Sequence, residues 1–531
     1  MALSSTDQTK PLRCVLVIDL GSGGPKAGVV AEDGRVLASA AVHVPTIILP
    51  DGGAEQDPQA WWDGAIAAAR RAVIESAVPQ DRIIAVCCDS QFGVIVPIDE
   101  HGGILMNAIH WLDRRGGPYN RAVVSGFPSL QGYGLNKLIT WIRHTGLAPT
   151  RSGVDSLGHI LYIKHERPDL YRKTRVFLEP MDYLIFRLTG KVAASQHTML
   201  PSAVVATRTW GTVEYCDPLI RYAGIDRSKL PPLVPNDDIA GTVRPEVAAA
   251  IGIPAGTPVV AGMNDTNCSA IGAGAVRDFD GIIYIGTSLV MTCHVPFKKT
   301  DLFHMMFSMP SPLRNKYLLF AEQGVGGKAL EFLLNLIYAD DQFATGPAPD
   351  DAIMRADRAA ASAPAGSGGA VFLPWLNGTI VPEENERARG AFFNLSLATT
   401  RPHLVRSVLE GLAFNSRWTR IAAERFIGCR FTSFRFAGGG ARSDLWAQIH
   451  ADILGVPILQ IDDSDRATLR GAGLAALVNL GRIQIEDIPD LVPIRRVYEP
   501  NPSHRDIYDR LFKAFTRLFK RNRPIFNILN E

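Results

Sequence analysis

The segment Arg13-Cys-Val-Leu-Val-Ile-Asp-Leu-Gly-Ser-Gly-Gly-Pro-Lys26 sets the expected fold of the chain. It begins with a β-branched, apolar run up to Asp19, which is typical of a buried strand. The glycines that follow predict a tight turn, and residues 26–31 and 35–40 predict two further strands. An alanine-rich stretch with helical spacing and another strand-like run come next. The predicted order is therefore three strands joined by turns, then a helix and a further strand.

A similar pattern returns in the second half of the chain. Residues 257–263 predict a strand that leads directly to Asn264-Asp265. Two further strands, 281–285 and 289–295, then flank the turn Gly286-Thr287-Ser288. Each half therefore has one hairpin that combines glycine with a hydroxyl residue. This repetition predicts a duplicated architecture.

The composition excludes several classes of protein. The 531 residues carry a net charge of +2, which is too weak a bias to predict binding to nucleic acid or to a membrane. The seven cysteines are scattered and form no CxxC pair, which argues against a disulfide scaffold or a zinc site. No apolar run approaches the roughly 18 residues that a membrane helix needs, and the first residues lack an apolar signal core. We therefore expect a cytoplasmic protein.

The first candidate site is the turn that follows Asp19. Glycines let a phosphate approach the backbone N–H groups, Lys26 can offset phosphate charge, and Asp19 can hold Mg²⁺ through its waters. The segment is not a Walker loop, and Pro25 before a β-rich run argues against a dinucleotide fingerprint, which needs a helix there. A glycine-rich hairpin without a function remains an alternative interpretation of this segment.

Two further candidates lie in the second half. Asp265 follows a predicted strand and precedes small residues, where it can serve either as a general base or in a structural role. Three glycines, 438–440, separate a predicted strand from a predicted helix that begins at Ser443, a good N-cap residue. That loop either admits a nucleoside or is only a tight connection between the strand and the helix.

Taken in order, these segments resemble the motifs of the FGGY family of carbohydrate kinases, within the actin-like ATPase superfamily. Segment 19–26 resembles the first phosphate motif, and segments 262–265 and 286–288 are similar to the base region and the second phosphate motif. Segment 438–446 resembles the adenosine motif. Further similar segments are Glu55-Gln-Asp-Pro58 with Trp61-Trp62, Trp111-Leu-Asp113-Arg-Arg115, Asp182-Tyr183 with Leu188-Thr-Gly190, Leu373-Pro374, Arg389-Gly390 and Glu410-Gly411.

The resemblance implies two actin-like, RNase H-type α/β domains with a central cleft between them. We place the N-terminal domain at 13–255, the C-terminal domain at 256–500, and a C-terminal helix and tail at 501–531, with that helix able to return to the first domain. ATP and Mg²⁺ are the implied cofactors. The implied acceptor is a small sugar or polyol, with a pentulose such as xylulose as the first candidate, and a homodimer is one option for the assembly.

The resemblance also implies roles for individual residues. Asp265 would take the proton from the acceptor hydroxyl, and Asp19 would organise Mg²⁺. The acceptor would be surrounded by Gln91, Trp111, Asp113, Asn264 and Asp265. The nucleotide would be held by Gly21, Ser22, Lys26, Gly286, Thr287, Ser288, Gly326, Gly327, Gly439, Gly440 and Ser443.

The chain departs from the family pattern at two positions. Within the family the resemblance is strongest to xylulokinases, which usually have G-Q-M-H-G at the sugar site, whereas this chain has Gly93 where the histidine would be. Pro25 is expected to remove one N–H from the first phosphate loop. These departures keep open one alternative, a catalytically silent regulator that binds sugar or nucleotide on the same scaffold. A second alternative, a nicotinamide-dependent oxidoreductase that uses the glycine turn, would need a helix after Gly24, which the sequence argues against.

Overall fold

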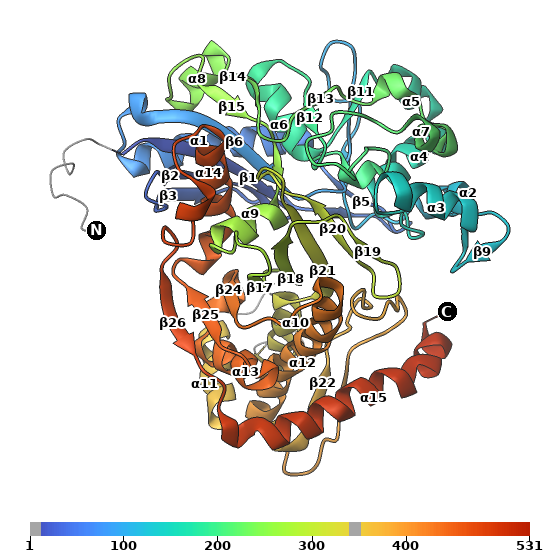
Figure 1. The fold of residues 1–531 in the computed structure, drawn as a ribbon, viewed down its shortest axis with the longest axis vertical. Helices are drawn as coiled ribbons and strands as arrows, with labels where there is room; N and C mark the ends of the chain where they lie inside the picture. The colour runs from blue at the N-terminus through green and yellow to red at the C-terminus, as the bar shows by residue number, and fades with distance from the viewer. Residues whose placement is uncertain (1–11, 339–351, 531) are drawn as a thin grey trace.

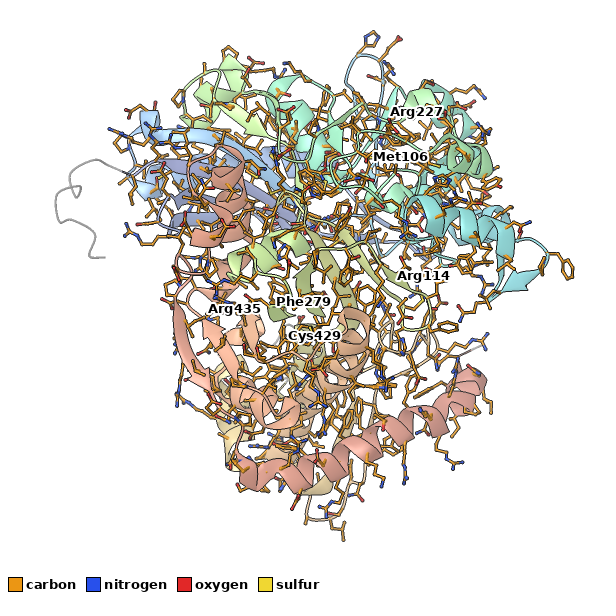
Figure 2. All side chains as sticks on the ribbon, viewed as in Figure 1. Met106, Arg114, Arg227, Phe279, Cys429 and Arg435 are labelled. Carbon is orange, nitrogen blue, oxygen red and sulfur yellow. The ribbon has the colours of Figure 1, made fainter. Side chains whose placement is uncertain are left out.

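The computed structural model describes residues 12–338 and 352–530, which form two α/β bodies, each built on one large sheet (Figure 1). The N-terminal body occupies the upper part of the figure and the C-terminal body the lower part. Side chains fill the space between the ribbons (Figure 2). In the part of the chain that the structure describes, no helix is long and apolar enough to span a membrane.

The sheet of the N-terminal body grows from the predicted opening strands. β1 pairs antiparallel with β2 and parallel with β6, and β2 pairs antiparallel with β3. β1 is buried on both faces, as expected for a central strand. The order across the sheet is β14 (Ile239–Thr242), β15 (Pro258–Val260), β6 (Ile83–Ser90), β1 (Cys14–Gly21), β2 (Gly24–Ala31) and β3 (Val36–Ala41), and β16 (Met263–Asn264) also pairs with β6.

The sheet of the C-terminal body repeats this topology. β17 pairs antiparallel with β18 and parallel with β24, while β18 pairs antiparallel with β21 and β24 pairs parallel with β25. The order β21-β18-β17-β24-β25 thus matches β3-β2-β1-β6-β15, so the predicted duplication is confirmed. The full order is β19 (Thr300–Asp301), β20 (Met306–Pro310), β21 (Tyr317–Val325), β18 (Ser288–Val295), β17 (Gly281–Ile285), β24 (Phe434–Ala437), β25 (Ile458–Ile461) and β26 (Ile494–Tyr498).

Different helices cover the two faces of the first sheet. α1 packs on one face, against the core that contains Leu16 and Ile18. α9 and α14 pack on the other face, with Val15 and Val17, in a core cluster that includes side chains of both sheets. The helices are α1 (Pro58–Ser76), α2 (Gly117–Val124), α3 (Leu135–His144), α4 (Ser156–Glu166), α5 (Pro168–Lys173), α6 (Pro180–Thr189), α7 (Asp217–Ala223), α8 (Pro245–Ile251), α9 (Asp265–Gly272), α10 (Gly327–Tyr338), α11 (Ala352–Ser362), α12 (Arg401–Ile427), α13 (Asp444–Leu454), α14 (Ala467–Asn479) and α15 (Arg505–Leu529).

The contact between α9 and α14 requires glycine on both helices. A Cβ atom at Gly272 would lie 1.7 Å from the carbonyl oxygen of Ala467, and one at Gly471 would lie 1.7 Å from that of Cys268. The two backbones can approach this closely because neither glycine carries a side chain. Arg435 of β24, labelled in Figure 2, donates to the carbonyl oxygen of Ala273 at 2.9 Å, which links the second sheet to the end of α9.

The predicted domain boundary at residues 255 and 256 falls within the chain segment that builds the first sheet. β15 and β16 follow this point in the chain, and both pair with β6. α14 also packs on the first sheet, although it follows the second sheet in the chain.

Short strands complete the fold: β4 (Ile47–Ile48), β5 (Ala54–Gln56), β7 (Val96–Ile98), β8 (Ala108–Ile109), β9 (Ser129–Leu130), β10 (Tyr133–Gly134), β11 (Val176–Leu178), β12 (Ala194–Ser195), β13 (Leu233–Val234), β22 (Val371–Leu373) and β23 (Ala391–Phe393).

The C-terminal helix α15 packs on the C-terminal body and does not return to the first domain. Phe519 of α15 is buried, with its ring 4.8 Å from that of Trp375 and 5.1 Å from that of Trp418. Tyr508 accepts a hydrogen bond from Arg406 of α12 at 3.1 Å. The option of a return to the first domain is therefore wrong, because the apolar side chains of α15 belong to the core of the second body.

Candidate active site

A row of four residues crosses the first sheet where β1 and β6 end. Asp19 of β1 lies opposite Lys26 of β2 on one side and opposite Asp89 of β6 on the other, and Asp89 lies opposite Met263 of β16. Residues directly opposite each other in neighbouring strands project from the same face. The face is the one covered by α9 and α14, since Val17 belongs to that core. The row therefore points toward the C-terminal body.

Asp19 and Lys26 were predicted as site residues from the sequence, whereas Asp89 was not. The Asp89 side chain is fully buried, and no N–H or hydroxyl group of the described residues donates to its carboxyl oxygens. Burial raises the pKa of Asp89 well above its usual value, and the charges of Asp19 and Asp265 raise it further. The only signal in the sequence was a charged residue inside an otherwise apolar strand, in the stretch Ile83-Ile-Ala-Val-Cys-Cys-Asp-Ser90.

Asp265 is the first residue of α9. The preceding Asn264 caps this helix, because its side-chain oxygen accepts from the backbone N–H of Asn267 at 2.9 Å. Thr266 donates its hydroxyl to Asp265 Oδ1 at 3.3 Å. Burial, followed by the charge of Asp19, raises the pKa of Asp265 to about 7. A carboxyl group with this pKa can accept a proton near neutral pH.

Residues of the C-terminal body face this carboxyl group. The charge of Glu322 on β21 also raises the pKa of Asp265, and burial raises the pKa of Glu322 itself to about 7. Burial raises the pKa of Tyr284 on β17, and the charges of Asp19 and Asp265 add to that effect. The acidic groups at the strand ends of the first sheet therefore lie where the two bodies meet.

A hydrogen-bonded network lies beside these carboxyl groups. Ser22 donates its hydroxyl to Gln91 Oε1 at 2.8 Å and accepts from the indole N–H of Trp111 at 3.0 Å. Gln91 in turn donates to Gln56 Oε1 at 3.0 Å, and Gln56 donates to the carbonyl oxygen of Ser22 at 2.9 Å. Ser22, which was expected on the phosphate side, thus makes its contacts with two residues predicted to bind the acceptor. Gln56 was not among the predicted site residues.

Asp113 is buried and already engaged within the protein. Its carboxyl oxygens accept from the backbone N–H of Ala54 at 2.9 Å and form an ion pair with Arg115 at 2.7 Å. Arg115 also pairs with Glu55 at 2.7 Å and stacks on Tyr162. This geometry favours a role in which Asp113 supports the loop that carries Trp111. The predicted contact of Asp113 with the acceptor stays a prediction.

The structure brings the predicted nucleotide segments of the C-terminal body together. The N–H groups of Gly326 and Gly327 donate to the carbonyl oxygens of Thr287 and Gly286, at 2.9 and 2.8 Å. These two N–H groups therefore support the turn, and phosphate contact through them stays a prediction. The Thr287 side chain is exposed and that of Ser288 is half-buried, at the surface of the same turn.

The glycine loop packs against the end of β17, next to Gly286. A Cβ atom at Gly440 would lie 2.6 Å from the side chain of Ile285, whereas one at Gly439 would meet no atom within 4 Å. Ser443 is the N-cap of α13 as predicted, since its hydroxyl accepts from the N–H of Trp446 at 3.0 Å. The same hydroxyl donates to Asp357 at 2.9 Å. A contact of Ser443 with the nucleoside stays a prediction.

The two departures from the family pattern have different consequences. The carbonyl oxygen of Pro25 accepts from the N–H of Val42 at 2.9 Å. Within a strand, the N–H and the C=O of one residue point toward the same neighbouring strand. The N–H that Pro25 lacks would therefore point toward Val42, which follows β3, and away from the phosphate turn. The expectation that Pro25 removes a donor from the phosphate turn is therefore wrong.

Gly93 has a φ of +75°, a backbone conformation that favours glycine. A Cβ atom at this position would lie 3.5 Å from the carbonyl oxygen of Val154 and 3.8 Å from the side chain of Trp111.

Comparison with protein families identifies the chain. The model of the FGGY family of carbohydrate kinases, N-terminal domain, matches residues 14–272, and the model of the C-terminal domain matches residues 281–480. The chain belongs to the FGGY family of carbohydrate kinases. It is accordingly an ATP-dependent enzyme that phosphorylates a carbohydrate.

Curated relatives match along nearly the whole chain. The xylulose kinase of Bacillus subtilis (strain 168) is 26% identical over 523 residues, covering 98% of this chain and 99% of the relative. The gluconokinase of the same organism is also 26% identical, over 514 residues and 95% of both chains. FGGY kinases with different acceptors in their names thus share the same percentage of identical residues with this chain.

Solved structures share the fold. The xylulose kinase of Rhodospirillum rubrum has a TM-score of 0.81 at 26% identity, covering 97% of this chain and 100% of that one. The ligand-bound xylulose kinase of Lactobacillus acidophilus has a TM-score of 0.83 at 23% identity, covering 98% and 100%. The expected two-domain FGGY fold, consistent with an actin-like ATPase, is confirmed.

Proposed function

We propose that this FGGY kinase phosphorylates a neutral sugar, with a pentulose such as xylulose as the first candidate, and that Asp265 is the general base. The observation that carries the proposal is the position of Asp265 beside the amide and indole network. Asn264 lies opposite Ser90 in the paired strands β16 and β6, and Asp265 and Gln91 are the residues that directly follow these two strands. A base and donors for sugar hydroxyls are thus placed side by side.

The polar groups near Gln91 favour an uncharged acceptor. The network of Gln91, Gln56, Trp111 and Ser22 consists of amides, an indole and a hydroxyl, which match the alternating donors and acceptors of a polyol. The guanidinium group of the nearby Arg115 is held by Asp113 and Glu55. An acid such as gluconate would need a cation for its carboxylate, and this arginine is already neutralised.

In the proposed mechanism, Asp265 accepts the proton of the acceptor hydroxyl while that oxygen attacks the terminal phosphate of ATP. The turn 286–288 and the loop 438–440 would hold the nucleotide on the C-terminal body, and Lys26 would offset phosphate charge from the N-terminal body. Phosphoryl transfer depends mainly on positioning and on neutralising charge. Exclusion of water by the two bodies would keep ATP from hydrolysis.

The residues at the strand ends fit a magnesium ion. Asp19 is 5% exposed and lies beside Asp89, to whose buried oxygens no N–H or hydroxyl group of the described residues donates. Mg²⁺ is usually held by one or two carboxylates together with waters and substrate phosphates. Asp19 would hold the ion, which when bound neutralises phosphate charge.

A coupled assay of ADP release over pentuloses, hexuloses, polyols and gluconate tests the proposed substrate class. We expect turnover with a neutral pentulose to exceed turnover with gluconate by at least tenfold in kcat/KM, about 1.4 kcal/mol, because the acceptor site offers no free cation among the residues described above. Preference for gluconate would contradict the substrate class. Absence of turnover with every acceptor, together with ATP binding that needs no sugar, would favour the silent regulator.

A further inference from the structure

Asp89 lies in the row of side chains that points toward the nucleotide side of the site, yet the proposed mechanism gives it no role. Its Cα is paired with that of Asp19 in the parallel strands β1 and β6. Asp89 is 0% exposed and Asp19 is 5% exposed. The two carboxyl groups therefore project from the same face, next to each other and away from bulk water.

The surroundings of Asp89 offer its carboxylate form no N–H or hydroxyl donor among the described residues. Both of its oxygens are buried, and among the described residues the carboxyl group of Asp19 is the one hydrogen-bonding partner within reach, so the two acids share a proton when no cation is present. Another buried acid, Glu179, shows the usual arrangement, because Ser156 and the backbone N–H of Val94 donate to its two oxygens. Burying a carboxylate without donors is costly, and placing it beside a second carboxylate adds repulsion. A cation between the two groups would offset both effects.

Lys26 does not supply this cation by direct pairing. Lys26 lies opposite Asp19 on the far side from Asp89, so Asp19 separates the lysine from Asp89. The neighbour of Asp89 on its other side is Met263, which carries no charge. Within the described residues, no cluster of three or more His, Cys, Asp or Glu is arranged to hold a metal on its own.

We propose that Asp89 is a second carboxylate ligand, with Asp19, for the Mg²⁺ that accompanies ATP. This inference rests on the proposed function, in which the ion binds beside Asp19. A pair of carboxylates completed by waters and substrate phosphates is the usual protein contribution to an Mg²⁺ site. In this arrangement the Mg²⁺ ion supplies a positive charge next to the carboxyl oxygens of Asp89.

Asp182 offers a matched control for this proposal. It is also fully buried with both oxygens unpartnered. It lies on α6, which packs on the other face of β6, since Ser90 contacts Met181 of α6 at 3.5 Å and successive strand residues alternate between faces. Asp182→Asn therefore removes a comparable buried carboxyl group without touching the row that contains Asp19 and Asp89.

The test measures Mn²⁺ binding to the ADP-saturated full-length enzyme, from the electron paramagnetic resonance signal of free Mn²⁺. We expect Asp89→Asn and Asp19→Asn to weaken Mn²⁺ affinity by about 10-fold or more, the range seen when groups that support a metal site are removed. Asp182→Asn should bind Mn²⁺ as the wild type does. Unchanged affinity in Asp89→Asn, with weakened affinity in Asp19→Asn, would overturn the proposal.

Two additions separate this proposal from the proposed function. If both Asp19→Asn and Asp89→Asn bind Mn²⁺ normally, the pair is not the metal site, whereas sugar turnover by the wild type still supports the kinase assignment. Circular dichroism and thermal unfolding show whether each variant is folded. If Asp89→Asn does not fold, Asp89→Ser, which removes the charge and reduces the volume, gives the same comparison, and wild-type affinity in that variant overturns the proposal.

Discussion

Asp265, the proposed general base, shows how placement, more than residue type, can prepare a carboxyl group for base catalysis. It starts α9 directly after a two-residue strand, so the backbone fixes its position between the first sheet and the C-terminal body. Burial and the neighbouring Asp19 charge raise its pKa to about 7. An ordinary exposed aspartate, with a pKa of about 4, would be a much weaker base.

The raised pKa of Asp265 predicts the pH dependence of the reaction. The base must be ionised, so kcat/KM should fall about tenfold for each pH unit below about 7. The stability of the ligand-free enzyme should change in the opposite direction. Because the folded-state pKa lies above the unfolded one, the folded protein loses stability as pH rises toward and through 7.

A pH–rate profile of kcat/KM for the sugar checks this expectation, with Glu322→Gln as the control. Glu322 has a similarly raised pKa, and its charge raises that of Asp265. In Glu322→Gln the acid limb should persist and move to lower pH. A limb that disappears in this variant would assign the titration to Glu322 and not to Asp265.

Single residues were predictable from the sequence only where they belonged to a turn or followed a strand. Asp19 and Lys26 flank a glycine turn, and Asp265 follows a strand, so their positions carried a signal. Asp89 sits within a strand and became meaningful only through its register with Asp19. Asp113 illustrates the converse, because its motif could not show that Arg115 and Ala54 already occupy its oxygens.

At the scale of elements, local patterns predicted the hairpins but not the partners of distant helices. The strand–turn–strand units at 14–31 and 281–295 were predictable because glycine turns separate apolar runs. The position of α14 on the first sheet was not, because its contact with α9 depends on Gly272 and Gly471, nearly two hundred residues apart. The packing of α15 on the second body likewise depends on aromatic contacts that no local pattern specifies.

The aromatic anchor of α15 should contribute strongly to stability. Phe519 is 0% exposed and packs on Trp375 and Trp418, so Phe519→Ala should lower the free energy of unfolding by about 3–5 kcal/mol. Ile528, near the end of the same helix, is 73% exposed, and Ile528→Ala should change the free energy of unfolding by less than about 0.5 kcal/mol. Urea unfolding checks both values, and equal effects would show that α15 is not anchored by its aromatic face.

At the scale of the whole molecule, the two bodies meet through several side-chain contacts, one of which adjoins the network of Gln91. Phe92, which follows Gln91, contacts Phe320 of β21 edge to face, with ring centroids 6.1 Å apart. Trp210 of the N-terminal body donates to the Ser311 carbonyl oxygen at 2.8 Å, and Arg314 pairs with Asp237 at 2.7 Å. The duplicated sheets and these contacts together place the proposed acceptor side of one domain against the proposed nucleotide side of the other.

The contact between Phe92 and Phe320 should support closure over the sugar. Such aromatic pairs contribute about 0.5–1.5 kcal/mol, so Phe320→Ala should lower kcat/KM for the sugar by roughly 2- to 10-fold. ATP affinity should change little, because the contact lies on the acceptor side. Phe307→Ala serves as the control, since Phe307 contacts Phe320 within the C-terminal body and does not touch Phe92 in an aromatic pair. Equal losses in both variants would argue against a role in closure.

The most direct test of the central claim is the turnover of Asp265→Asn with the best acceptor at saturating ATP and Mg²⁺. A positioned general base contributes about 10²–10⁴-fold, so we predict that kcat falls by this factor while ATP binding, followed by calorimetry, stays close to that of the wild type. The amide keeps the size of the side chain and leaves the Asn264 cap of α9 in place. Near-normal turnover in this variant would contradict the assignment of Asp265 as the base.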